Sequence, residues 1–149
     1  MANRLPLVQN AGQTQQLQAA DVLAVPALAA TGAITCGGGI GYAAGAGGTV
    51  TQGTSRATGV TLSKLCGNIT MFSAAVAAQA TSVFTLTNTL IAATDFVLIE
   101  HISGTNGGAW QFSVVAAAGS ASITVRNVST ASITEATPLR FAVIKAVTA

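Results

Sequence analysis

Charged residues are scarce in this chain, which has six Lys or Arg and four Asp or Glu among 149 residues. A typical soluble domain is about a quarter charged. Enzyme active sites need titratable groups that converge, and this chain has few to bring together. A surface with so little charge is also poorly protected against association. We therefore expect a structural protein whose surface is covered by partner subunits, and not an enzyme.

Histidine and cysteine are almost absent, which leaves little for metal or nucleophilic chemistry. The two cysteines, Cys36 and Cys66, make no disulfide framework, and with His101 they give no ligand spacing for a metal. We favour two buried thiols and expect neither a metal nor a cofactor. Glu100 precedes His101, but neighbours on a strand face opposite sides, so they form no dyad. His101 is predicted to be a surface or interface residue.

Neither a basic run nor a long apolar helix is present. The net charge is +2 and the basic residues are scattered, so we expect no nucleic-acid partner. Residues 22–55 carry no charge, but Pro26 and seven glycines between Gly37 and Gly48 interrupt them. A membrane-spanning helix needs about 20 consecutive apolar residues. We expect no membrane span, and the opening residues lack the apolar core of a signal peptide.

The chain changes character along its length. Residues 1–32 are rich in Gln and Ala, with a turn signal at Asn10-Ala11-Gly12, and predict an extended arm or small hairpin followed by a linker. Residues 33–149 form the main predicted domain, which includes a Gly-rich loop at 37–48. Residues 39–44 match the loosest dinucleotide-binding pattern, but a predicted strand follows where the motif needs a helix. We therefore interpret residues 37–48 as a flexible or subunit-packing loop.

From Thr49 onward, apolar and polar residues alternate with period two, and turn signals separate the short runs. This pattern, with abundant Thr and Val, predicts an all-β fold: an antiparallel β-sandwich or jelly roll with an extended N-terminal arm. Residues 96–102 are more continuously apolar, as expected of a strand covered on both sides, and Ala74–Ala80 predicts a short helical turn. The predicted core comprises Phe84, Leu86, Phe96, Leu98, Phe112, Val125 and Phe141.

Two parts of the chain resemble a known group of proteins. The opening, Arg4-Leu5-Pro6-Leu7-Val8 through Gln15-Gln16-Leu17-Gln18-Ala19-Ala20-Asp21, resembles the start of many tailed-bacteriophage virion proteins. The region from Gly39 to Ala149 resembles a family of small phage structural proteins found near head and tail genes. The likeness is carried by residues 39–43, 47–52, 58–62, 69–71, 84–88, 91–95 and 141–149.

The resemblance implies a virion structural protein and brings no catalytic residues. We expect a capsid decoration (cement) protein, made in the bacterial cytoplasm and placed on the capsid surface. Its expected partners are the major capsid protein and itself, as a homodimer or homotrimer. The alternative is a head fibre or tail-associated module that binds a host surface receptor.

The segment Ala2–Val25 is the predicted latch to the capsid or to a neighbouring subunit. Extended, Gln-rich chain can add backbone hydrogen bonds to the edge of a neighbour's sheet. The predicted contact residues are Leu5, Leu7, Val8, Gln15, Gln16 and Leu17.

Overall fold

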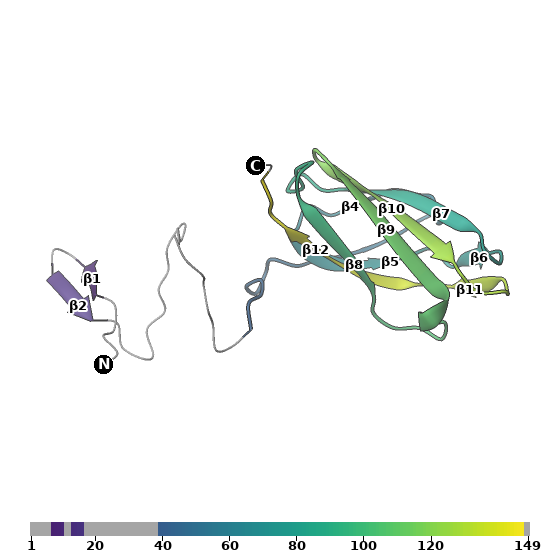
Figure 1. Ribbon diagram of the computed structural model, residues 1–149, viewed down its shortest axis with the longest axis horizontal. Helices are drawn as coiled ribbons and strands as arrows, with labels where there is room; N and C mark the ends of the chain where they lie inside the picture. Colours follow the sequence, from purple (N-terminus) through teal and green to yellow (C-terminus); the bar gives the residue numbers. More distant parts are fainter. Residues whose placement is uncertain (1–6, 11–12, 17–38, 148–149) are drawn as a thin grey trace. The chain divides into compact units, whose positions relative to one another are not determined.

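A computed structural model of the chain describes residues 7–10, 13–16 and 39–147. The chain divides into two compact units, Met1–Gly39 and Ile40–Ala149, which are described separately. In the first unit, strand β1 (Leu7–Asn10) pairs antiparallel with strand β2 (Gln13–Gln16), with two residues between them (Figure 1). The two short extended pieces predicted around the turn signal are therefore paired strands. The rest of the predicted arm and its linker lie outside the described residues.

The second unit is built from strands joined by loops (Figure 1), which confirms the all-β prediction. A single turn of 3-10 helix, η1 (Gly107–Ala109), is the one helix among residues 40–147. The strands are β3 (Thr49–Thr51), β4 (Val60–Thr61), β5 (Cys66–Thr70), β6 (Ala74–Val76), β7 (Thr81–Thr87), β8 (Phe96–His101), β9 (Trp110–Ala117), β10 (Ser120–Asn127), β11 (Ile133–Glu135) and β12 (Pro138–Ile144).

Two four-stranded sheets, in the orders β4-β7-β10-β9 and β3-β5-β12-β8, make up most of this unit, and β6 pairs with β11 in a third sheet. Both large sheets are mixed, because β3 runs parallel to β5 and β4 runs parallel to β7. The prediction of purely antiparallel sheets is therefore wrong at these two pairs. A parallel neighbour needs a connection that leaves the sheet. The chain supplies one by forming β4 in the other sheet between β3 and β5.

The two large sheets contribute to one hydrophobic core. Alternate residues of β7, β10 and β12 are buried, as the period-two pattern predicts. Phe84, Leu86, Val125 and Phe141 are at most 3% exposed, so these four core predictions are confirmed, and Phe112 is partly buried against the core. The other buried apolar residues are Val60, Ile69, Met71, Val76, Ile91, Trp110, Ala121, Ile123, Ile133, Leu139 and Val143.

Two predictions about apolar segments are wrong. Phe96 and Leu98 were expected in the core, but they are 65% and 55% exposed because they point away from it on the outer side of β8. Ala74–Ala80 was expected to form a helical turn, but its first three residues are strand β6. In that strand, Val76 is buried and pairs with Ile133 of β11. Burial of Val76 outweighs the high helix propensity of the alanines, because tertiary packing overrides local propensity.

Buried amide side chains fix the loops between these strands. The Asn127 side chain donates to the carbonyls of Val76, Ala77 and Ala131. Asn88 donates in the same way to the carbonyl of Lys64. Because a buried amide without partners costs about 1–3 kcal/mol, each of these networks favours one loop conformation.

Candidate interaction surface

The outer side of strands β8 and β12 carries a row of exposed apolar side chains. Three cross-strand pairs face outward here: Phe96 with Ile144, Leu98 with Ala142, and Glu100 with Arg140. Phe96, Leu98 and Ile144 are 65%, 55% and 49% exposed, and Ala142 is half-buried. We call the four residues Phe96, Leu98, Ala142 and Ile144 the apolar face. Contiguous exposed apolar patches, unlike scattered single residues, mark interaction sites on soluble proteins.

A single ion pair borders the apolar face. The Arg140 guanidinium lies 2.7 Å from the Glu100 carboxylate, and both side chains remain more than half exposed. An exposed pair of this kind adds little stability, typically less than about 1 kcal/mol. The pair therefore contributes little to folding, and it places one charge of each sign beside an apolar surface.

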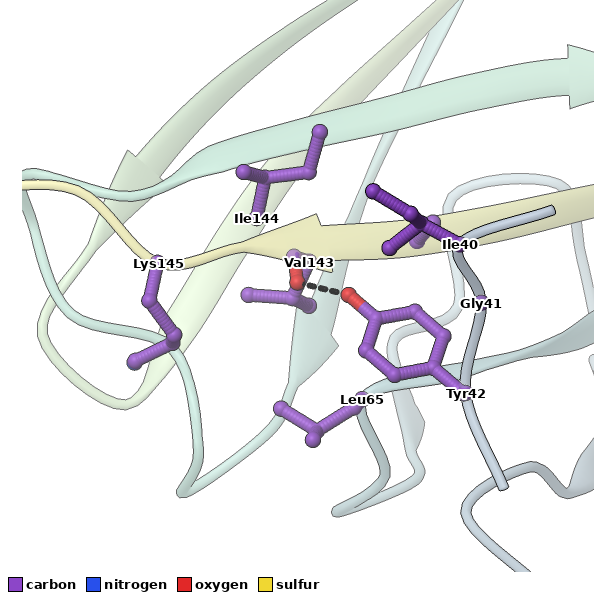
Figure 2. A pocket seen from close by; sticks show the side chains of 8 residues that line it. Ile40, Gly41, Tyr42, Leu65, Val143, Ile144 and Lys145 are labelled. Carbon is purple, nitrogen blue, oxygen red and sulfur yellow. Dashed lines mark hydrogen bonds between the residues drawn. The ribbon is translucent and has the colours of Figure 1, made fainter. Parts of the chain in front are cut away.

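A shallow hollow adjoins the apolar face where the second unit begins. It is lined by Ile40, Gly41, Tyr42, Leu65 and residues 142–145, and Figure 2 shows several of these side chains around strand β12. The Tyr42 hydroxyl donates a hydrogen bond to the carbonyl of Val143, which holds this segment beside the strand (Figure 2). Ile40 is 83% exposed. The lining offers apolar contact and no acid or histidine.

Lys145, the one charged residue lining this hollow, is already engaged. Its ammonium donates to the Asp95 carboxylate and to the carbonyl of Leu90. Asp95 also accepts the backbone N–H groups of Ala92 and Ala146. The Ala92 hydrogen bond, followed by Lys145, lowers the pKa of Asp95 below its usual value. This lock ties the end of β12 to the loop before β8 and leaves little charge free for binding.

The outer side of the other large sheet has a different character. Most of its outward residues on β7, β9 and β10 are hydroxyl or other polar side chains, with Val83, Val115 and Ala117 as exposed apolar exceptions. The polar ones are Thr81, Thr85, Thr87, Gln111, Ser113, Ser122, Thr124 and Arg126. The apolar face on β8 and β12 is therefore a specific feature of one sheet and not a general property of the surface.

Away from the apolar face, Arg56, Asn106, Trp110 and Glu135 form a cluster of interacting polar and aromatic side chains. Glu135 accepts hydrogen bonds from the Trp110 indole at 2.7 Å and from the Asn106 amide at 3.1 Å. Arg56 is 5% exposed and lies 5.2 Å above the Trp110 ring. Its guanidinium donates to the backbone carbonyls of Glu135 and Ala74. This polar cluster joins four segments that are distant in the sequence.

The electrostatics of this cluster favour the charged form of Glu135, whereas burial disfavours the charge of Arg56. Burial raises the pKa of Glu135, but the hydrogen bonds from Trp110 and Asn106, with the charges of His101 and Arg56, hold it below its usual value. Burial lowers the pKa of Arg56, and the Glu135 charge opposes that shift. With each group engaged by its neighbours, the cluster serves to hold the loops together.

His101, which the sequence predicted to be a surface or interface residue, borders this cluster. Glu100 and His101 occupy opposite sides of β8, as predicted, because Glu100 points outward to Arg140. The His101 Nε2 atom is buried and has no hydrogen-bond partner among the described residues. His101 lies next to Gly104, where an added Cβ would be 3.1 Å from Nε2. The space beside the imidazole is thus occupied by backbone.

The predicted contact residues are only partly within the described structure. Leu7 and Val8 lie on β1 and pair with Gln16 and Gln15 of β2. Leu5 and Leu17 lie outside the described residues, as does Cys36. Cys66 lies on β5 and is half-buried. The hairpin therefore brings four of the six predicted contact positions together.

The apolar face itself was missed by sequence reasoning. The continuous apolar run at residues 96–102 was the available signal, since both sides of that strand are apolar. It was interpreted as burial within the chain, whereas only Val97 and Ile99 pack against the core. The same signal is equally typical of a strand whose outer side is covered by another molecule.

Within residues 7–10, 13–16 and 39–147, no three His, Cys, Asp or Glu side chains are grouped so that they could hold a metal ion. Across the same ranges, the structure has no helix with the length and hydrophobicity needed to cross a membrane. No protein-family model, no curated protein and no solved structure matches the chain.

Proposed function

We propose that this chain is a structural protein of a bacteriophage virion, and specifically a capsid decoration protein that stabilises the assembled head. The observation that carries the proposal is the apolar face, an exposed surface suited to contact with other subunits. The resemblance of residues 4–21 and 39–149 to phage virion proteins supports the same role. We also propose that the two large sheets, which share one core, form a β-sandwich that serves as a rigid platform.

The proposed mechanism is adhesive. A protein that binds the assembled shell, and not its free subunits, shifts the equilibrium toward the shell by mass action. Many copies with modest individual affinities add up over a capsid under pressure from packed DNA. The work is therefore done by surface contacts, and no step requires a catalytic residue, metal or cofactor.

The N-terminal segment Ala2–Val25 is the proposed latch to the major capsid protein. Its described part is the hairpin of β1 and β2, with four residues in each strand. An isolated two-stranded hairpin is marginally stable in water, so packing on a capsid subunit would stabilise this one. Backbone pairing with a sheet edge of a capsid subunit is the contact that suits it.

Immunogold labelling of intact virions tests the location. Antibody against the purified protein is expected to cover the heads at high density. Label confined to the tail or its tip would sink the decoration proposal and would favour the tail-associated, receptor-binding alternative. Absence of label from virions would reject both.

A binding experiment tests the latch. Purified protein is mixed with expanded, undecorated capsids and pelleted, in parallel with a variant that lacks residues 2–25. The full chain is expected to pellet with capsids and to stay in the supernatant when only dissociated capsid subunits are present. Capsid binding that survives the truncation unchanged would show that the latch lies elsewhere. Circular dichroism of the truncated protein checks that residues 40–149 remain folded.

A further inference from the structure

The apolar face is not explained by the core or by the polar cluster. Phe96, Leu98 and Ile144 expose about half or more of their surface on adjacent strands. The inner side of β8 packs on the core through Val97 and Ile99. A strand that is apolar on both sides is typical of a sheet covered on both sides. Among the described residues the core covers only one side of β8, so the other side is suited to a partner.

We infer that a second copy of this chain covers the apolar face, sheet against sheet, about a two-fold axis parallel to strands β8 and β12 and midway between them. The register supports this geometry, because each outward residue of β8 has a directly opposite outward residue on β12. A rotation about that axis exchanges the two strand positions and keeps every pair at the same height. Phe96 then meets Ile144 of the second copy, and Leu98 meets Ala142 of the second copy.

The shapes of these residues fit that superposition. Leu98 is large and exposed, whereas its cross-strand neighbour Ala142 is small and half-buried. A hollow at this point is lined by Leu98, Ala142, Glu100 and Arg140, among others. The axis directs Leu98 of each copy toward the hollow of the other. The contact is made twice, as a two-fold interface requires.

The charges fit as well. Glu100 and Arg140 form an ion pair within one copy, so the border of the face carries no net charge. The two-fold axis places Glu100 over Arg140 of the second copy, which gives four charges that alternate in sign. A partner surface of a single sign would repel one of the two residues. A second copy of this surface attracts both.

The size of the sheet predicts a weak contact. The proposed axis overlaps only β8 and β12 of each copy, and two strands about 4.8 Å apart and about six residues long cover roughly 200 Å² in projection. A standard interface buries about 800 Å² of accessible surface on each partner. The exposed Ile40, in the hollow beside Ile144, adds to the contact area. We therefore expect the full chain to be monomeric at low micromolar concentration and to dimerise as its concentration rises.

Sedimentation velocity of the purified full chain tests this inference, over concentrations from about 5 to about 500 μM. The wild type is expected to move from a monomer to a dimer boundary. Leu98→Lys is expected to remain monomeric throughout, since it places a charge inside the contact. Val115→Lys is the matched control, because Val115 is 67% exposed on the outer side of the other large sheet. This control is expected to dimerise like the wild type.

Charge exchange tests the orientation of the two copies. Glu100→Lys and Arg140→Glu are each expected to raise the dissociation constant about tenfold or more, by setting like charges against each other. The variant with both changes restores alternating signs and is expected to recover most of the affinity. A double variant no better than the single ones would overturn the proposed axis. Circular dichroism confirms that each variant is folded.

Two further results would refute the second copy as the occupant. One is a wild type that remains monomeric at every concentration, and the other is a dimer that survives Leu98→Lys. Self-association of purified protein needs no capsid, so its failure is separate from failure of the proposed virion role. Pelleting of the Leu98→Lys variant with capsids separates the two directly. A variant that is monomeric and still binds capsids supports both proposals.

Discussion

Phe96 and Phe141 offer a direct test of which side of the β3-β5-β12-β8 sheet faces the core. Both residues lie on adjacent paired strands, but Phe141 is 3% exposed and Phe96 is 65% exposed. Replacing a buried Phe with Ala costs about 3–5 kcal/mol, from lost transfer free energy and the cavity left behind. Fully burying a Phe is worth about 1.5–3 kcal/mol, so the third of Phe96 that is covered accounts for about 0.5–1 kcal/mol.

The expected loss for Phe141→Ala is a large part of the total stability of a typical domain, about 5–15 kcal/mol. At about 4 °C for each kcal/mol, its melting temperature falls by about 12–20 °C, while that of Phe96→Ala falls by about 4 °C or less. Urea unfolding followed by circular dichroism measures both free energies. The work is done at about 5 μM, where the proposed dimer is dissociated.

Equal losses for the two variants would refute the assignment of inner and outer sides to this sheet. A loss for Phe96→Ala that grows with protein concentration would instead follow from burial of Phe96 by a second copy, since association stabilises the folded state. Unchanged m-values are the internal check that the two variants unfold in the same way as the wild type.

Three further predictions concern single contacts. Gly67→Ala should lose about 1–3 kcal/mol in urea unfolding, because its Cβ would lie 2.6 Å from the Gly48 carbonyl oxygen, whereas Gly53→Ala, with open space, should lose little. The lowered pKa of Asp95 makes its contribution to stability fully present above its unfolded pKa of about 3.9 and lost as the pH falls through the folded value. Between about pH 6 and about pH 2, the free energy of unfolding of Asp95→Asn should therefore fall less than that of the wild type. Arg56→Lys should lower the free energy of unfolding by about 1–3 kcal/mol in thermal or urea unfolding, because an ammonium cannot reproduce the guanidinium contacts. An unchanged free energy of unfolding would exclude a structural role for the Arg56 guanidinium.

The period-two alternation made much of this fold predictable from the sequence. Phe84 and Leu86 on β7, like Val125 on β10, alternate with mostly polar residues, so strand geometry together with those polar neighbours predicts which side is buried. The turn signal at Asn10-Ala11-Gly12 predicted the hairpin of β1 and β2. The scarcity of charged side chains, which favours association, can be read from the composition without knowledge of the fold.

The Ala74–Ala80 segment shows where local reasoning fails. Alanine favours helix in isolation, but Val76 is buried and paired with Ile133, which lies 57 positions later in the chain. The parallel pairing of β3 with β5 also depends on a distant part of the chain, because it requires β4 to join the other sheet. Such long-range pairings leave no signal in the residues of one segment.

The sequence by itself predicted a strand with two apolar sides at residues 96–102, where every position except Glu100 and His101 is apolar, and strand β8 occupies Phe96–His101. Which side the core covers was decided only by the tertiary structure. Pairing with β12 turns Val97 and Ile99 inward and leaves Phe96 and Leu98 exposed beside Ile144. Alternation along a strand does not specify which of its two sides is buried. The register with neighbouring strands decides which side meets solvent or another molecule.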